Sequence, residues 1–240
     1  MVLNYQQKIN GLYILDKEDI DEIATMTLNK YLPNVLTQER SVDIEALAEN
    51  SLFLTIRYEA IAHEETILGA IALDDSEGVP CYGDKYQTTK TALPAGTVLI
   101  NSCLLEDASK SRLRFTIAHE AAHWLLHRSY YSPTNQQYKF REQRLPYIAC
   151  RDANFKPIER HKLKTDEEWM EWQANALAAS LLMPLAPFRS VANWALRVCD
   201  RNYLSPYADR ELIEEIAKTF MVSRTAADVR LKQLGYIQAQ

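Results

Sequence analysis

Residues 114–127 of the chain read RFTIAHEAAHWLLH and contain one complete HExxH pattern in a mostly apolar run. No proline or glycine interrupts the run, so it predicts one unbroken helix that is buried on most sides. Histidines four residues apart stand one turn apart on one face of a helix, which lets His119 and His123 present their imidazole nitrogens to one zinc ion. Glu120 lies about 100° further round the helix, placed to take a proton from water on the metal rather than to bind the metal itself.

Composition narrows the class of protein. The chain has 240 residues, of which 47% are hydrophobic, enough for one large domain or two small ones. Its formal net charge of -5 gives no general attraction to nucleic acid or anionic lipid, so direct nucleic-acid binding is not expected. With no signal-peptide pattern and no apolar run of about 20 residues, we expect a cytoplasmic protein without membrane contact. The 4 cysteines are widely spaced, which favours reduced thiols.

Two helices and a small sheet are expected before the HExxH run. Apolar residues recur at helical spacing over 16–32, and a shorter helix is expected over 42–49. Runs rich in β-forming residues at 52–58, 66–73 and 97–101 predict a small twisted sheet.

Two segments of unusual composition are expected to lie outside regular structure. Residues 74–96 are rich in Gly, Pro, Asp and Thr and predict a loop. Residues 139–164 carry eight Lys or Arg and three Asp or Glu, a local net charge of +5 in an acidic protein. A solvated excursion is the favoured interpretation of this segment, and a flap that faces substrate or an acidic partner is the alternative.

A second strong helix is predicted to follow the basic segment. Residues 165–168 read TDEE, which has the form of a capping box, and the helix should run to Met183 before Pro184. Its alanine-rich centre permits close approach of a neighbouring helix. Glu171 shares the inward face with Asn175 and is a candidate third metal ligand.

Two neighbouring acids compete with Glu171 for that role, because Glu167 and Glu168 lie in the same first turns of the helix. Periodicity alone leaves the choice among the three open. After this helix, further helices are expected over 188–198, 211–220 and 224–234, the last two as a helix-turn-helix-like pair.

Two stretches together resemble the ImmA/IrrE family of zinc metallopeptidases: FTIAHEAAHWLLH at 115–127 and EWQANALAASLLMP at 171–184. The C-terminal segment is similar to the family's terminal helices, although Met221 stands where glycine is usual. The resemblance implies that His119, His123 and Glu171 bind zinc and that Glu120 is the catalytic acid and base. The separation of 48 residues from His123 to Glu171 is long for the family and implies an insertion over or beside the cleft.

The expected fold is therefore α+β: a zincin-like metallopeptidase domain with a small twisted sheet, the HExxH helix and a C-terminal helix-turn-helix-like pair. We expect this domain to span residues 1–200, with an insertion at 133–165, and the helical pair to span 201–240 and pack on the same domain. A net charge of zero over 209–240 favours packing over DNA reading for the pair.

The expected function is zinc-dependent hydrolysis of a peptide bond in a protein. The family resemblance suggests that the substrate is a helix-turn-helix repressor of a mobile element or stress regulon. A hydrogen-bond donor for the oxyanion is also expected, and Tyr130, Tyr131, Tyr147 and His161 are the candidates. The alternative is a non-enzymatic or latent regulator that binds a repressor or DNA through its C-terminal helices.

Overall fold

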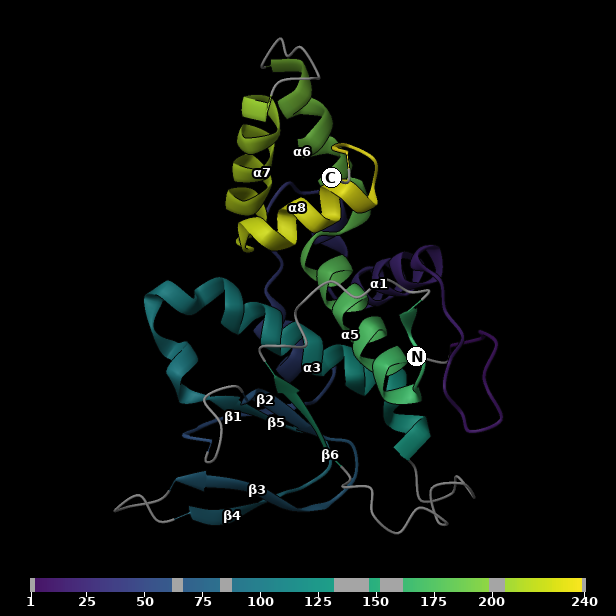
Figure 1. Ribbon diagram of the computed structural model, residues 1–240, viewed down its shortest axis with the longest axis vertical. Helices are drawn as coiled ribbons and strands as arrows, with labels where there is room; N and C mark the ends of the chain where they lie inside the picture. The colour runs from purple at the N-terminus through teal and green to yellow at the C-terminus, as the bar shows by residue number, and fades with distance from the viewer. Residues whose placement is uncertain are drawn as a thin grey trace.

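The HExxH run forms one helix, α3 (Lys110–Tyr131), which lies between the sheet and the remaining helices (Figure 1). The predicted unbroken, mostly buried helix is therefore confirmed. The computed structural model describes residues 3–61, 67–82, 88–131, 147–151, 162–198 and 206–238. Within these residues the fold is mixed α+β, as predicted.

The other elements follow in chain order. The remaining helices are α1 (Lys17–Tyr31), α2 (Ile44–Ala46), α5 (Asp166–Leu182), α6 (Leu185–Val198), α7 (Pro206–Phe220) and α8 (Arg224–Gln233). Short 3₁₀ or π turns occur at η1 (Pro33–Leu36), η2 (Leu47–Ser51), η4 (Ser102–Leu105) and η5 (Asp107–Ser109). The strands are β1 (Thr55–Glu59), β2 (Ile67–Ala72), β3 (Ser76–Tyr82), β4 (Thr88–Leu93), β5 (Thr97–Asn101) and β6 (Tyr147–Arg151). No described helix is long and apolar enough to cross a membrane.

The main sheet has four strands in the order β1-β5-β2-β6. β1 runs parallel to β5, whereas β2 is antiparallel to both β5 and β6. The three predicted strands are confirmed, and β6 adds a fourth from inside the segment predicted as an insertion at 133–165. Residues 147–151 therefore form a strand rather than part of a solvated loop. Their backbone N–H and C=O groups are paired with β2, a partner distant in the chain that no local sequence pattern indicates. Residues 132–146 and 152–161 lie outside the described part of the chain.

The loop predicted over 74–96 is wrong, since most of it forms the antiparallel hairpin β3–β4 below the main sheet (Figure 1). Cys81 and Leu93 are buried together with Ile61 and Leu99, so the hairpin has its own small apolar cluster. Threonine-rich runs are typical of both loops and strands, and here cross-strand pairing and burial decide between them.

A close contact between the sheet and α3 depends on Gly69 in β2. A Cβ atom at this position would lie 2.7 Å from Cγ2 of Thr116 and 3.2 Å from Oε1 of Glu120. Only glycine lets the strand approach the helix so closely without displacing these side chains. The sheet is thereby held against the turn of α3 that carries the HExxH pattern.

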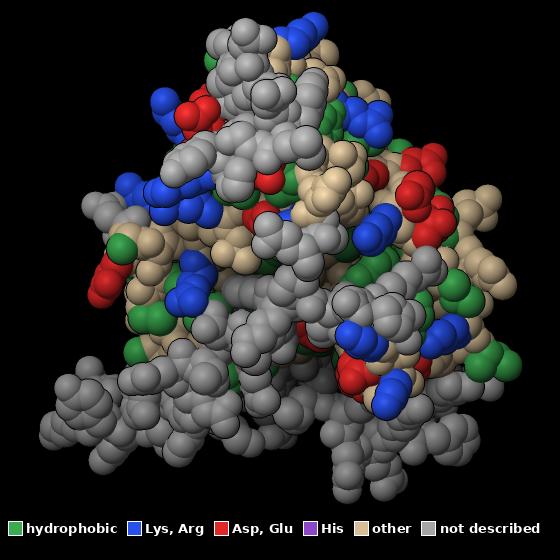
Figure 2. Space-filling view, turned by 45° about the horizontal axis from the view of Figure 1, so that its top comes forward, with side chains coloured by type: hydrophobic (Ala, Val, Ile, Leu, Met, Phe, Trp, Pro, Cys, Tyr) green, Lys and Arg blue, Asp and Glu red, His purple; other side chains and the backbone are tan. Residues whose placement is uncertain are grey.

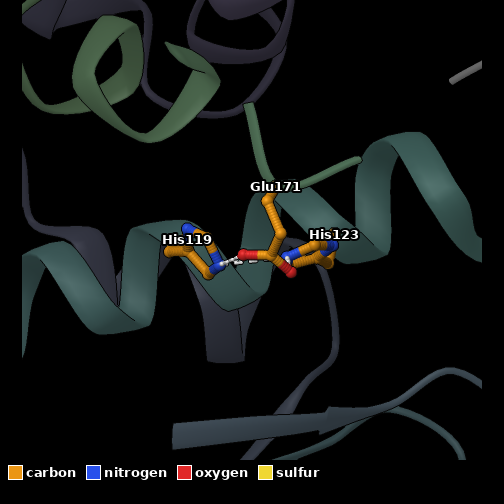
Figure 3. A group of neighbouring side chains, drawn as sticks. All are labelled: His119, His123 and Glu171. Carbon is orange, nitrogen blue, oxygen red and sulfur yellow. Dashed lines mark hydrogen bonds and ion pairs between the residues drawn. The ribbon is translucent and has the colours of Figure 1, made fainter. Parts of the chain in front are cut away.

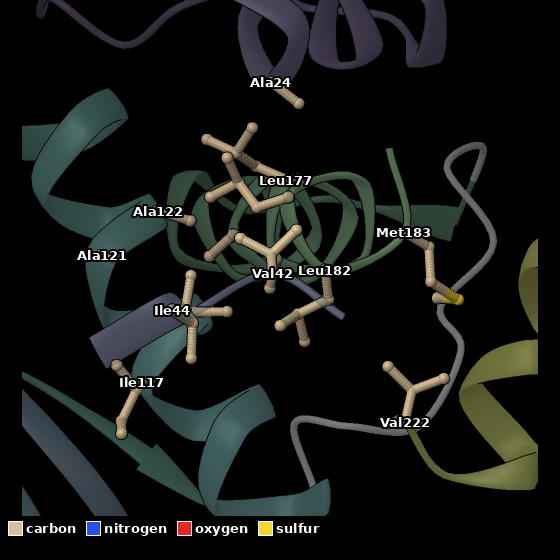
Figure 4. Close-up of a cluster of buried hydrophobic side chains, with 14 of the residues drawn as sticks. Ala24, Val42, Ile44, Ile117, Ala121, Ala122, Leu177, Leu182, Met183 and Val222 are labelled. Carbon is tan, nitrogen blue, oxygen red and sulfur yellow. The ribbon is translucent and has the colours of Figure 1, made fainter. Parts of the chain in front are cut away.

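On its other side α3 packs against α5, and small residues on both helices make this close. Ala121 and Ala122 of α3 and Ala174 and Ala178 of α5 are all fully buried. Figure 4 shows the surrounding apolar cluster, to which α1, α2 and the residues after α5 also contribute. The predicted capping box at Thr165 is present and sets where α5 begins.

The C-terminal helices form as predicted, and their turn adopts the backbone conformation that favours glycine. Met221 has a φ of 53°, in the left-handed region. A non-glycine residue there carries some backbone strain. The division into 1–200 and 201–240 stays a prediction.

A buried ion pair ties α8 to the first helix of the chain. The guanidinium of Arg230 donates to both carboxylate oxygens of Asp21, at 2.6 and 3.3 Å, and the side chain of Arg230 is 1% exposed. The hydroxyl of Ser180 in α5 donates to the same carboxylate at 2.7 Å. Three helices distant in the sequence thus meet at one carboxylate.

We expect Arg230→Met to lower the free energy of unfolding by about 3–5 kcal/mol, because it leaves the Asp21 carboxylate without its counter-charge. Urea denaturation measures this loss. Lys232→Met is the matched control in the same helix, since its ion pair with Asp228 is partly exposed and should cost no more than about 0.5 kcal/mol. Equal losses in the two variants would contradict the role given to the buried pair.

Candidate metal centre

The candidate centre lies where α3 and α5 cross, and the two helices run in opposite directions there. Side chains from successive turns of α3 meet residues progressively earlier in α5: His119 meets Asn175, His127 meets Gln173 and Tyr130 meets Asp166. Antiparallel packing thus places Glu171 opposite the HExxH turn.

Three side chains converge on one point, as Figure 3 shows. The Nε2 atoms of His119 and His123 are 3.0 Å apart, and the Glu171 carboxylate oxygens lie 3.4 and 3.5 Å from them. In a tetrahedral zinc site with bonds of about 2.0–2.1 Å, ligand atoms are about 3.3 Å apart. The arrangement therefore fits one divalent ion bound by two imidazoles and a carboxylate.

The two rival acids have other surroundings. The Glu168 carboxylate accepts hydrogen bonds from the backbone amides of Lys164 and Thr165, at 2.6 and 3.1 Å, and these bonds lower its pKa. Glu167 is exposed to solvent. Among the three acids that the sequence left open, only Glu171 faces the histidines.

Glu120 is completely buried beside the three converging side chains. Neither carboxylate oxygen has a hydrogen-bond partner among the described residues. Burial, and secondarily the charge of Glu171, raises the pKa of Glu120 well above its ordinary value. An orphaned buried carboxylate is costly, and such a group fits a proton acceptor that meets its partner only when substrate and metal are present.

Hydrogen bonds fix the orientation of the two histidine rings. Nδ1 of His119 lies 3.0 Å from Oδ1 of Asn175, and an amide oxygen can only accept, so this nitrogen carries the proton. The lone pair of His119 is then on Nε2, which faces the point of convergence. Burial, and then the neighbouring His119 and His127, lowers the pKa of His123 well below its ordinary value, so its ring is neutral at neutral pH.

His127, one turn after His123 in α3, is completely buried. Its Nδ1 lies 2.9 Å from Nδ1 of His123, and its Nε2 lies 3.0 Å from Oε1 of Gln173. Burial lowers the pKa of His127 to about 4, against the raising effect of the Gln173 hydrogen bond. All three described histidines are thus internal, and Figure 2 shows none on the face drawn.

Of the four predicted oxyanion donors, the structure describes the surroundings of Tyr130 and Tyr131. The hydroxyl of Tyr130 lies 3.5 Å from Asp166, at the start of α5, and Tyr131 is buried in the apolar core. The side chain of Tyr147 and all of His161 lie outside the described part of the chain. The oxyanion donor stays a prediction.

Cys150 in β6 is also a neighbour of the centre, which the wide spacing of the cysteines did not predict. Its sulfur, one nitrogen of His119 and one carboxylate oxygen of Glu120 all lie within 4.8 Å of one another. In the sheet Cys150 pairs with Gly69, the residue against which α3 packs. β6 is therefore the edge strand nearest the candidate centre, and no other described strand pairs with its outer edge.

Comparison with known families supports a metallopeptidase domain. Residues 147–232 match the model of a peptidase family described as the IrrE N-terminal-like domain, which confirms the resemblance predicted from the sequence. The match contains Glu171 and Asn175 but begins after the HExxH pattern. No curated protein matches the chain.

We expect Glu171→Gln to weaken zinc binding by about 100-fold or more, because substitutions around metal ligands alone commonly cost 10–100-fold. Competition with a chromophoric chelator measures the affinity. Glu167→Gln, the same change four residues earlier in the helix, should bind zinc as the wild type does. Equal affinity in the two variants would exclude Glu171 as a ligand.

We also expect Glu120→Gln to stabilise the metal-free protein at neutral pH by about 0.5–2 kcal/mol, the usual gain when a functional strain is removed. A carboxyl group with a raised folded pKa contributes stability that is present below its unfolded value, about 4.3, and is lost as pH rises through the folded value. The variant should therefore gain more at about pH 7.5 than at about pH 4. Urea unfolding of both metal-free proteins at both pH values tests this, and a gain that does not grow with pH would contradict it.

Proposed function

We propose that the chain is a zinc-dependent endopeptidase whose metal ligands are His119, His123 and Glu171. The observation that carries this proposal is the buried, unpartnered Glu120 beside three converging ligand atoms. A purely structural metal site has no use for such a carboxylate, whereas peptide hydrolysis needs a base at this place. The family match over 147–232 supports the same class of reaction.

Each residue of the centre has a distinct part in the proposed reaction. Zinc, when bound, would polarise a peptide carbonyl and make a water molecule more acidic. Glu120 accepts a proton from that water and then donates it to the leaving amine, a task for which its raised pKa suits it. Asn175 keeps the ring of His119 in the orientation that directs Nε2 to the metal.

The edge strand β6 is the proposed place for substrate. An extended peptide can add to the edge of a sheet through main-chain hydrogen bonds, and β6 lies beside the centre at the outer edge of the sheet. We propose a protein substrate, a helix-turn-helix repressor by family resemblance. No contact among the described residues bears on that identity.

The competing function is a non-enzymatic regulator that acts through α7 and α8. The cost of burying Glu120 argues against it, because selection for binding alone would favour a hydrogen-bonded or apolar residue there. The two functions differ in one measurable respect, since a regulator hydrolyses nothing whether or not Glu120 is present.

We expect Glu120→Gln to retain zinc and to lower the rate of peptide hydrolysis by about 10²–10⁴-fold, the usual contribution of a general acid and base. Purified helix-turn-helix repressors and unfolded casein are incubated with each protein, and products are followed by mass spectrometry alongside metal analysis. Glu167→Gln is the control and should cleave as the wild type does.

Unchanged hydrolysis by Glu120→Gln would disprove the role of Glu120. Cleavage of casein but of no repressor would disprove only the proposed substrate. A wild-type protein that holds zinc and cleaves neither would favour the regulator.

A further inference from the structure

A line of hydrogen bonds leads from the N-terminal segment to the candidate metal ligand His123. It begins at the backbone carbonyl of Tyr13, which accepts from Nε2 of Gln173 at 2.7 Å. Oε1 of Gln173 then faces Nε2 of His127 at 3.0 Å, and Nδ1 of His127 faces Nδ1 of His123 at 2.9 Å. Both histidines and Gln173 are fully buried, so water does not compete for these bonds.

Each link in this line permits only one placement of protons. A carbonyl only accepts, so the Tyr13 oxygen selects the amino group of Gln173 and turns its oxygen towards His127. That oxygen also only accepts, so Nε2 of His127 carries the proton of the neutral ring. Nδ1 of His127 is then an acceptor, and Nδ1 of His123 must donate to it. The lone pair of His123 is left on Nε2, 3.0 Å from Nε2 of His119, whose lone pair faces the same point, so the two repel unless a metal cation or a proton lies between them.

We infer that His127 is a positioning residue that holds His123 in the tautomer able to bind metal, and that Tyr13 sets this arrangement through Gln173. A metal-bound histidine usually donates its other nitrogen to a carboxylate or a backbone carbonyl. Here the backbone carbonyl acts at a distance, through one amide and a second imidazole.

Gln173 is needed because two neutral imidazoles can share a hydrogen bond in either direction, with either ring as the donor. Without Gln173, the proton of His127 can sit on Nδ1 and be donated to Nδ1 of His123. His123 would then carry its own proton on Nε2, where it blocks the metal. The amide oxygen of Gln173 excludes this second arrangement, because it can only accept a hydrogen bond and therefore requires a proton on Nε2 of His127.

The first acceptor of the line is itself held in place. Lys8 and Asn10, a few residues before Tyr13, contact the Asp166 carboxylate at 2.8 and 2.6 Å, at the start of α5. Gln7 and Tyr13 form a β-bridge, which closes this N-terminal segment on itself. This N-terminal segment, which lies outside the family match, therefore helps to hold the residues of the candidate metal centre in place.

This inference rests on the proposed metal centre but can be tested without metal. In metal-free, full-length, ¹⁵N-labelled protein near neutral pH, long-range ¹H–¹⁵N spectra distinguish the two histidine tautomers, with assignments from single-histidine variants. We expect the proton of His123 on Nδ1 and that of His127 on Nε2. The reverse placement on either ring would overturn the inference. If the wild type binds no zinc, the proposed function is wrong. The tautomer measurement still tests the inferred proton positions on His123 and His127 in that case.

Two substitutions at one position supply the second readout. Gln173→Leu removes the acceptor for His127 and should weaken zinc binding by about 10–100-fold. In Gln173→Glu a protonated carboxyl group can still donate to the Tyr13 carbonyl and accept from Nε2 of His127, so this variant should lose less zinc affinity than Gln173→Leu. Chelator competition measures zinc binding, and circular dichroism checks the fold of each variant. Wild-type affinity in Gln173→Leu, or equal weakening in both, would overturn the inference; if Gln173→Leu does not fold, the tautomers of the wild type decide it.

Discussion

The antiparallel contact between α3 and α5 is the constraint on which the candidate centre depends. Opposite helix directions place Glu171, Gln173 and Asn175 within reach of successive turns of α3. Buried alanines on both helices keep the axes close enough for short side chains to meet. One helix thus supplies a candidate ligand and the two amides that orient the candidate histidine ligands.

The same contact places several polar groups in the interior, where their burial lowers the stability of the fold. Three buried histidines and the orphaned Glu120 carboxylate lie within residues 119–127 of α3, and the buried amide of Gln173 faces His127 from α5. The fold offsets part of this cost by giving hydrogen-bond partners to Nδ1 of all three histidines and to Nε2 of His127, but it leaves Glu120 without one. Stability is therefore reduced at the group that the proposed chemistry needs, which is the usual location of such strain.

Parts of the chain far apart in the sequence support this arrangement. Gly69 lets β2 lie against the turn of α3 that carries the HExxH pattern, and the carbonyl of Tyr13 accepts a hydrogen bond from Gln173. Near the C-terminus, Arg230 of α8 forms a buried ion pair with Asp21 of α1. The candidate centre therefore depends on residues outside the two recognisable motifs, and on segments that the family match does not include.

The sequence by itself determined the helices, because periodicity, capping residues and prolines are local signals that act within one element. It also narrowed the candidate ligands to His119, His123 and one of three acids, since the four-residue spacing fixes a helical face. Tertiary structure decided what local signals cannot: that Glu171 rather than Glu167 or Glu168 faces the histidines, and that His127 is internal. It also decided that residues 147–151 and the region after Leu73 form strands, because strand pairing is satisfied by partners distant in the chain.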